Sequence, residues 1–502
     1  IFVMYIIDSK MVNIENNCKW HFANFSGGRE DGPNEPMQEN FKKTPYASLI
    51  RESIQNSLDV CLDKDKPVEM VFKIKSINSH NYPNIFQIKD HVKGCLDHFK
   101  DNANAKFVYN PMIQYIKESS SVGSKMYYIQ VSDYNTKGMN YIPDDRNNSF
   151  YAFVRAAGVS AKADASAGGS FGYGKAAYFY LSSIRSIIIS TKTDKGKYFF
   201  EGVASLCTHS LNGEKKVAVG YYDNNEGTPV EDYNSIPYRF RRKDSEGNEV
   251  GPGTDINIMG IDLSETSESQ IYEEMLKALL RNFWMAIYEQ RLVVSIGDYK
   301  VSKDNLYEMM ISTFPEEHDS AKKIENYNPR PFLETVMHAN EDKNHVLFKC
   351  NLNQHPDCLS IANNVNWGTL YFYAWKTKHA NNRVVYMRKP RMLVYGQRNY
   401  SGNGYYGVFI CGNGLYNDFL RMTENPAHNE WNLKNCSDNK KELKSLVDLY
   451  IKFIDECIKS LFNYANTETL SIKGLDQYLY IPTDVENEDN DEAESVKDLE
   501  EK

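Results

Sequence analysis

The stretch SLIRESIQNSLD, residues 48–59, is the most informative part of this 502-residue chain. Thr44 before it can cap a helix and Pro45 suits the first helical position, so a helix is expected to run through the stretch. At 100° per residue, Glu52, Asn56 and Asp59 fall within roughly 60° of one another. Apolar residues occupy the opposite side, namely Ala47, Ile50, Ile54, Leu58 and Cys61. Since an ordinary surface helix shows the same pattern, the stretch gains meaning only from the motifs that accompany it.

Three further motifs follow in the same half of the chain. VSDYNTKGM, residues 131–139, puts Asp133 directly after a buried strand. AGGSFGYGK, residues 167–175, has glycines where backbone amides could approach a polyphosphate. GPGTDINI, residues 251–258, puts Thr254 on the way into a strand. Each motif alone is common in turns and caps, but four of them in this order are hard to produce by chance.

In these motifs the chain resembles the GHKL superfamily of Bergerat-fold ATPases, which includes gyrase, MutL, MORC proteins, heat-shock chaperones and histidine kinases. The resemblance covers roughly residues 41–262. In the layout of its domains the chain is most similar to the MORC, MutL and heat-shock-chaperone types. It implies an α+β fold, with a Bergerat-type α/β sandwich followed by a second, transducer-like α/β domain.

The resemblance also implies roles for individual residues. Glu52 matches the general base that activates the attacking water, and Asn56 the residue that holds Mg²⁺ against the phosphates of ATP. Asp133 matches the aspartate that reads the adenine amino group, and Thr254 the threonine that supports it through water. Further residues expected at the nucleotide are Asp59, Gly138, Met139, Gly169, Gly172, Gly174 and Lys175.

The chemistry of these residue types agrees with those roles. A triphosphate needs a metal ion, backbone amides and a helix N-terminus, and a helix starting at residues 172–175 can supply the last two. Hydrolysis needs a water held beside a carboxylate, and Glu52 lies one helical turn from Asn56. One departure from the family is that Asn135 and Thr136 replace the first glycine of its Asp-x-Gly-x-Gly turn, which is one residue longer here.

A basic turn is expected in the second domain. In RVVYMRKPRMLVY, residues 383–395, Arg388, Lys389 and Arg391 lie between two apolar strands. By analogy with the transducer-domain lysine or arginine of such ATPases, one of them is expected to reach the γ-phosphate. Lys389 is preferred because Pro390 fixes the turn after it, with Arg388 next. The alternative is a solvated basic turn.

The charge of the chain is 58 − 67 = −9, unevenly placed. Residues 484–502 hold ten acids and two lysines, which is −8 and leaves −9 − (−8) = −1 for the rest. We therefore expect an acidic, disordered tail on a near-neutral body. Acidity says little against a nucleic-acid partner for that body, and RFRRK, residues 239–243, is mild evidence for one. The alternative for this segment is a solvated hairpin.

Four parts of the chain are predicted. They are an N-terminal arm (1–40), the ATP-binding domain (41–262), a transducer-like domain that a helix closes (263–482) and the acidic tail (483–502). Second-domain strands are expected at 292–296, 346–352, 369–375, 383–395 and 407–411. No apolar run is long enough for a bilayer span, so we expect a cytoplasmic protein without a membrane partner.

Nine cysteines without a CxxC pair indicate neither a disulfide framework nor a zinc ribbon. Two loose clusters, His91 with Cys95 and His98, and Cys350 with His355 and Cys358, match ligand spacings poorly, and we expect packing roles for them. The segment TENPAHNEW, residues 423–431, has the composition of a defined local structure, without an evident mechanism.

The sequence therefore predicts a slow Mg²⁺-dependent ATPase that acts as a nucleotide-gated, dimerising switch or clamp. DNA is the favoured partner, in bacterial genome maintenance or phage (antiviral) defence. A chaperone-like or protein-assembly ATPase with a partner protein is the alternative. A histidine kinase is less favoured, because no His stands on a dimerising helix before the first motif.

Overall fold

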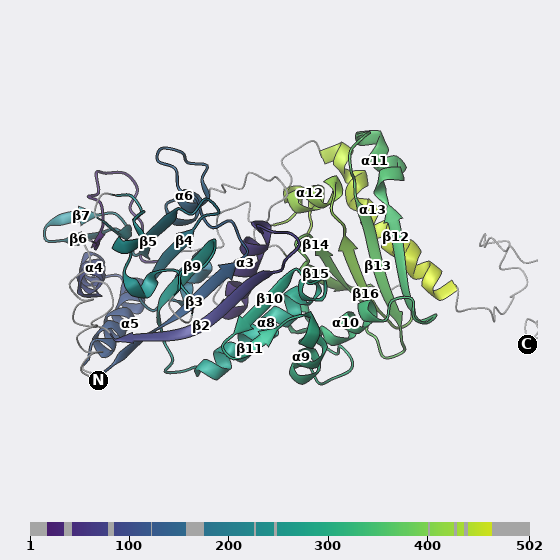
Figure 1. Ribbon diagram of the computed structural model, residues 1–502, viewed down its shortest axis with the longest axis horizontal. Coiled ribbons are helices and arrows are strands. Elements are labelled where there is room, and N and C mark those ends of the chain that lie inside the picture. The colour runs from purple at the N-terminus through teal and green to yellow at the C-terminus, as the bar shows by residue number, and fades with distance from the viewer. Residues whose placement is uncertain are drawn as a thin grey trace, which may run out of the picture.

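The computed structural model describes residues 18–34, 43–78, 85–121, 123–156, 175–224, 227–244, 248–399, 402–425, 429–435 and 440–463. Most of the predicted arm, the acidic tail and the loop glycines Gly169, Gly172 and Gly174 lie outside these ranges. The described chain forms two sheets that lie beside each other, each with helices on its faces (Figure 1). Among the described residues, no helix is both long and apolar enough to cross a membrane.

The first sheet has nine strands in the order β1-β8-β5-β4-β9-β3-β2-β10-β11. Neighbouring strands are antiparallel except β2 and β10, which are parallel. The strands, in sheet order, are β1 (Lys19–His21), β8 (Val219–Asp223), β5 (Tyr198–Ser205), β4 (Ser186–Lys192), β9 (Gly253–Ile261), β3 (Lys125–Tyr134), β2 (Val68–Asn78), β10 (Leu292–Ile296) and β11 (Tyr299–Val301). A short hairpin, β6 (His209–Leu211) with β7 (Glu214–Lys216), stands apart.

Alternation along the central strands gives this sheet two separate cores. In β4, Ile187 and Ile189 belong to one core and Ile188 to the other, because successive side chains point to opposite faces. The first core takes residues from α3 (Pro45–Asp59), α6 (Ser149–Val154), α7 (Ala176–Leu181) and α8 (Glu268–Tyr288). The second takes residues from α4 (Ile85–His98) and α5 (Ala103–Ser119). The result is the expected α/β sandwich.

The second sheet has five strands in the order β12-β13-β16-β14-β15. They are β12 (His345–Asn351), β13 (Thr369–Lys376), β16 (Tyr405–Cys411), β14 (Arg383–Arg388) and β15 (Met392–Arg398). The remaining helices along this part of the chain are α9 (Leu306–Thr313), α10 (Arg330–Met337), α11 (Pro356–Ile361), α12 (Leu415–Met422) and α13 (Lys440–Asn463). The fold class is thus as predicted: α+β, with a sandwich followed by a second α/β region.

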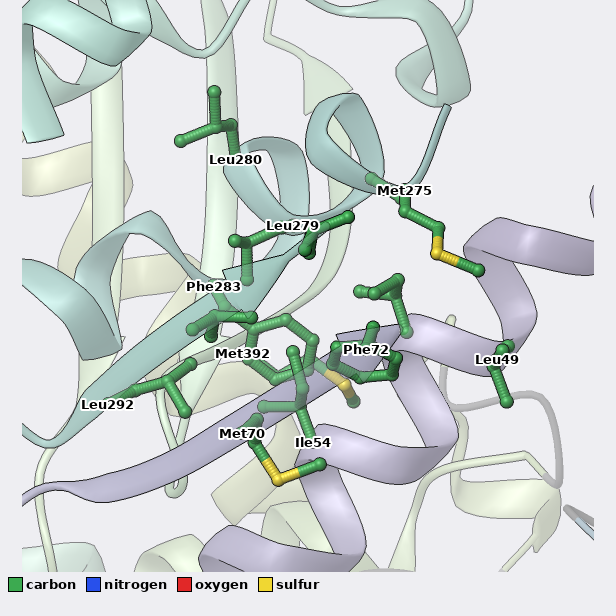
Figure 2. Close-up of a cluster of buried hydrophobic side chains, with 14 of the residues drawn as sticks. Leu49, Ile54, Met70, Phe72, Met275, Leu279, Leu280, Phe283, Leu292 and Met392 are labelled. Carbon is green, nitrogen blue, oxygen red and sulfur yellow. The ribbon is translucent and has the colours of Figure 1, made fainter. Parts of the chain in front are cut away.

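The two regions share one core rather than touching at their surfaces. Met392 of β15 belongs to the same core as Ile54 of α3, Phe72 of β2 and Phe283 of α8 (Figure 2). Helix α3, which carries the first predicted motif, is therefore held from both sides. A shift of the second sheet would be felt at α3, because packed interiors transmit strain.

Two local expectations were wrong. The strand at Leu292–Ile296 was expected in the second domain, but β10 pairs with β2 and extends the first sheet. Its alternating pattern predicted a strand correctly and could not say which sheet the strand joins. Thr44 precedes α3 as expected, but its side chain makes no capping hydrogen bond; Pro45 still occupies the first turn.

Candidate functional site

Besides Glu52, Asn56 and Asp59, two serines of α3 also take part in polar contacts. Glu52, Asn56 and Asp59 are half-buried, as are other residues on that side of the helix. Ser53 and Ser57 beside them are fully buried and form side-chain hydrogen bonds. Both serines therefore fix α3 to the elements around it.

Asp133 lies at the end of β3, where its carboxylate accepts three hydrogen bonds. Ser57 Oγ donates to Oδ2 at 2.9 Å, while Thr136 Oγ1 and the Thr254 backbone N–H donate to Oδ1, each at 2.7 Å. The side chain is only 9% exposed. A carboxylate has about four acceptor positions, so these donors orient the group and leave capacity for about one further donor. Such a position suits an exocyclic amino group.

Behind Asp133 stands Arg242, which is 1% exposed. Its guanidinium pairs with Asp255 at 2.6 Å and also donates to the Asp133 backbone carbonyl. Gly253 passes so close that a Cβ there would lie 2.2 Å from Arg242 Nη2 and 2.4 Å from the Asp133 carbonyl oxygen, and its φ is +144°. Glycine is required at this position for both reasons.

The turn after Asp133 closes against β4. Gly138 has φ +66°, and a Cβ there would lie 2.2 Å from the carbonyl oxygen of Lys192. Met139 N–H donates to Thr191 Oγ1 at 2.8 Å, and Thr191 Oγ1 lies 2.9 Å from Thr254 Oγ1. Gly138, Met139 and Thr254, which were predicted together, thus meet through Thr191, which the sequence did not single out.

The longer turn has a local explanation in Asn135. This residue adopts the left-handed conformation with φ +59°, which asparagine tolerates better than most residues. Its amide donates to the backbone carbonyls of Asp63, Lys66 and Pro67, at 2.9–3.1 Å. The departure from the family pattern therefore anchors the turn to the chain that follows α3.

Tyr178 of α7 links that helix to the site. It is buried, and its hydroxyl lies 3.0 Å from Ser53 Oγ. Burial raises its pKa far above the ordinary value, with the nearby charges of Glu52 and Asp133 acting in the same direction, so the phenol stays protonated. Sequence reasoning missed Tyr178, because an aromatic residue in an apolar helix reads as core. Lys175, just before α7, donates to the backbone carbonyl of Ala156.

The basic turn of the second region is anchored rather than solvated. Arg388 is 1% exposed and forms a two-pronged ion pair with Glu424. Arg391 pairs with Glu289 at 2.8 Å and donates to the Cys411 carbonyl. Lys389 between them is half-buried.

This turn lies close to α3, because the strand after it accepts a hydrogen bond from that helix. Burial works against the charged form of Arg388, but Glu424 and then Asp59 raise its pKa above the ordinary value. Arg51 of α3 donates to Asn282 of α8 and, at 3.1 Å, to the Leu393 carbonyl of β15. The middle of α3 thus contacts β15, the strand that follows the turn with Lys389.

The donor set of α3 fits Mg²⁺ held mainly by phosphates. Among described residues, no three His, Cys, Asp or Glu side chains cluster as a metal cage would require. Mg²⁺ is commonly bound by one or two protein oxygens together with substrate phosphates and water. The amide oxygen of Asn56, with Glu52 one turn away, can supply that share.

The histidines and cysteines of the first loose cluster have protein partners. His91 Nδ1 lies 2.8 Å from His209 Nε2, and the Cys95 thiol lies 3.8 Å from the Cys207 carbonyl oxygen. His98 contacts Ser210. In the second region, His355 caps α11, accepting from the Asp357 backbone N–H, and Cys358 is buried.

No family model and no curated protein matches the sequence. Solved structures do match, among them the following three, all at low identity. The ATPase region of Saccharomyces cerevisiae topoisomerase II, bound to ICRF-187, shares 9% identity at a TM-score of 0.37, over 81% of this chain and 85% of that one. The 43K ATPase domain of Thermus thermophilus gyrase B, in complex with an aminocoumarin, shares 10% sequence identity at a TM-score of 0.27. The match covers 79% of this chain and 100% of that one.

The gyrase B-subunit of Myxococcus xanthus shares 9% identity at a TM-score of 0.30, over 66% of this chain and 83% of that one. At such identities and scores, these similarities say nothing about the reaction of this chain, which has to be argued from its own residues.

Proposed function

We propose that this chain binds ATP with Mg²⁺ beside α3 and hydrolyses it slowly. The observation that carries the proposal is the Asp133 carboxylate, oriented by Ser57, Thr136 and Thr254 and retaining acceptor capacity. An adenine amino group can donate to that carboxylate, whereas the oxygen at the same position of guanine cannot. Asp133 therefore selects adenine, with Thr254 and the 138–139 turn beside it.

The phosphates extend along the polar face of α3 in this proposal. Asn56 holds Mg²⁺ against them, with Asp59 nearby, and Glu52 takes the proton from the attacking water. The loop glycines Gly169, Gly172 and Gly174 wrap the phosphates, with Lys175 at the start of the next helix. Bound Mg²⁺ supplies charge compensation for the triphosphate.

The decisive test is isothermal titration with a non-hydrolysable ATP analogue, with and without Mg²⁺. Binding that needs Mg²⁺, and a much weaker response to the matching GTP analogue, are expected. Equal binding of both analogues would contradict the role of Asp133. No binding at all would overturn the proposed function.

Lys389 is proposed to contact the γ-phosphate from the second region, where positive charge offsets the charge that develops during transfer. The half-buried state of Lys389 and the hydrogen bond from α3 to β15, the strand after this turn, support this. Lys389→Ala should lower kcat and leave the analogue Kd within about tenfold (~1.4 kcal/mol). Single-turnover hydrolysis measures the effect, and an unchanged rate would remove the second region from the site.

Hydrolysis is proposed to drive a nucleotide-gated switch in which ATP binding promotes a homodimer. Light scattering with and without the analogue should show a monomer become a dimer. A stable phosphohistidine after incubation with labelled ATP would favour the histidine-kinase alternative instead.

DNA is the proposed partner, consistent with genome maintenance or phage defence, through the segment at residues 239–243. Arg241 lies over the rings of Tyr233 and Tyr238 at 5.1 and 5.8 Å, and Lys243 Nζ lies 3.1 Å from the Tyr238 ring centre. Tyr238 is 43% exposed. Cations beside an exposed aromatic ring suit a nucleic-acid backbone and its bases. Arg242 of the same segment is buried with Asp255 and is not counted.

The test is ATPase activity with and without duplex DNA over a range of salt. Stimulation that falls steeply with salt is expected, because phosphate contacts release counterions. Replacing Arg239, Arg241 and Lys243 by Gln should abolish it. A charge-matched control replaces three exposed lysines of the α4–α5 layer, Lys100, Lys106 and Lys117. Indifference to DNA at low salt would favour the chaperone-like or protein-assembly alternative.

A further inference from the structure

The Glu424 carboxylate is buried at the second sheet, in the segment whose sequence suggested no mechanism. It is 1% exposed, and Arg388 Nε and Nη2 each donate to one of its oxygens. Trp431 Nε1 adds a third hydrogen bond at 3.0 Å, and residues 424 and 431 pair as an isolated β-bridge. Glu424 therefore brings to Arg388 a carboxylate that the Trp431 indole N–H also helps to hold.

Arg388, held by Glu424, in turn holds the backbone of Lys389. Its Nη1 donates to the Lys389 backbone carbonyl, and the Lys389 backbone N–H donates to Asn417 Oδ1 at 3.0 Å. Asn417 is itself 1% exposed. Both backbone polar groups of Lys389 are thus held by buried side chains, which leaves its backbone little freedom to reorient.

Stability alone is a poor reason for this arrangement. A buried ion pair is expensive to desolvate, and well-packed apolar residues of similar size are often as stabilising or more so. The pair also lies near the helix that carries Glu52 and Asn56, since Arg51 of that helix donates to the Leu393 carbonyl of β15, the strand that pairs with β14 at Arg388. Its place in the fold indicates a role at the site.

We infer that Glu424 is a positioning residue that acts through Arg388 to hold Lys389 toward the phosphate end of the site. Arg388, which sequence reasoning offered as a candidate for the phosphate contact, becomes part of the support instead. The inference rests on the proposed function. It adds that turnover depends on a carboxylate in the 423–431 segment, with no contact between Glu424 and ATP.

The first experiment compares Glu424→Gln with the wild-type chain. Gln keeps the shape but gives up the charge and one of the two carboxylate acceptors that the guanidinium uses. We expect kcat to fall at least tenfold while the Kd of the ATP analogue stays within about threefold. Arg383→Met is the matched control, because Arg383 begins the same strand and pairs with Asp319 in a buried ion pair. It should lower the Tm and leave kcat near the wild-type value.

The second experiment separates positioning from mere stability. In the double variant Arg388→Met with Glu424→Met, both charges disappear together, so the Tm should recover toward or above the wild-type value. A positioning role predicts that kcat stays at least tenfold low despite that recovery. A purely structural role predicts that kcat recovers with the Tm, and this result would overturn the inference.

Different results would overturn the role of Glu424 and the proposed ATPase function. Normal analogue binding with an unchanged kcat in Glu424→Gln overturns the inference alone. If the wild-type chain does not bind the analogue, the proposed function fails and the inference falls with it. If Glu424→Gln does not fold, the double variant and the Arg383 control still decide the question through kcat.

Discussion

Arg242 and Arg388 occupy corresponding positions in the two regions of the molecule. Each is buried, each pairs with a buried carboxylate, Asp255 or Glu424, and each donates to the backbone carbonyl of a predicted site residue. For Arg242 that residue is Asp133, and for Arg388 it is Lys389. In both regions a costly buried charge is used to fix the backbone of a residue expected at the nucleotide.

The difference lies in what each pair connects. Asp255 and Asp133 stand on adjacent strands, β9 and β3, so Arg242 locks one continuous sheet. Arg388 instead links β14 to the chain after α12, and the charge of Asp59 in α3 helps to raise the pKa of Arg388. The first pair therefore lies within one sheet, and the second lies where the two regions meet. Binding is expected to depend on the first and turnover on the second.

The largest effect is expected at Asp133 itself. Asp133→Ala removes the adenine acceptor and leaves the donors Ser57, Thr136 and Thr254 without their shared partner. Affinity for the ATP analogue should fall by about 100-fold or more (~2.7 kcal/mol) in calorimetry. Binding within a few-fold of wild type would show that the base is read elsewhere.

Glu52→Gln comes next and tests the chemistry without the binding surface. Only the group that takes the proton is lost, so analogue binding should be preserved while kcat falls by about 100-fold. Steady-state hydrolysis with a calorimetric control measures both quantities. Normal turnover would mean that another group serves as the base.

The pair of variants Arg242→Met and Arg388→Met tests the comparison directly. Each leaves one carboxylate buried without its partner, which typically costs about 3–5 kcal/mol of unfolding free energy. The functional losses should nevertheless differ. Arg242→Met should raise the analogue Kd, and Arg388→Met should mainly lower kcat. If both variants changed the analogue Kd and kcat to the same extent, the two ion pairs would have the same role.

The sequence predicted most of the scaffold because its signals are local. Apolar alternation located the central strands, and Asp133 could be placed at the end of a strand from its neighbours alone. The same reasoning located α8 and the basic turn of the second region. The roles given to the site residues stay predictions, because geometry alone does not test them.

What the sequence could not supply are partners far apart along the chain. Nothing marks Ser57 as a donor to Asp133, 76 residues later, since buried and exposed serines look alike. Likewise, the sequence offered Arg388 as a candidate for the phosphate contact, and nothing local marks its buried ion pair with Glu424, 36 residues away. Side-chain hydrogen bonds across the fold depend on packing that no local pattern encodes.

The smallest effect concerns a buried polar pair unconnected to any predicted site residue. His91 Nδ1 lies 2.8 Å from His209 Nε2, and His209 Nδ1 lies 2.8 Å from the Cys207 carbonyl oxygen. Burial, aided by the charges of His209 and Lys216, lowers the pKa of His91 to about 3, against an ordinary value of 6.5. Since the unfolded chain takes up this proton more readily, the stability contributed by neutral His91 is present above pH 6.5 and is lost as pH falls toward 3.

His91→Gln keeps a neutral hydrogen-bonding side chain and removes this titration. Denaturant unfolding between pH 7.5 and 5 should therefore show a shallower loss of stability on acidification than in the wild-type chain, by about 1–2 kcal/mol at pH 5. Analogue binding at pH 7.5 should be unchanged, because neither histidine holds the backbone of a site residue. An equal pH slope in both proteins would place the titration elsewhere. A loss of binding would show that buried polar pairs affect the site even where they hold none of its residues. The different effects expected for Arg242→Met and Arg388→Met could then not be assigned to the residues that each arginine holds.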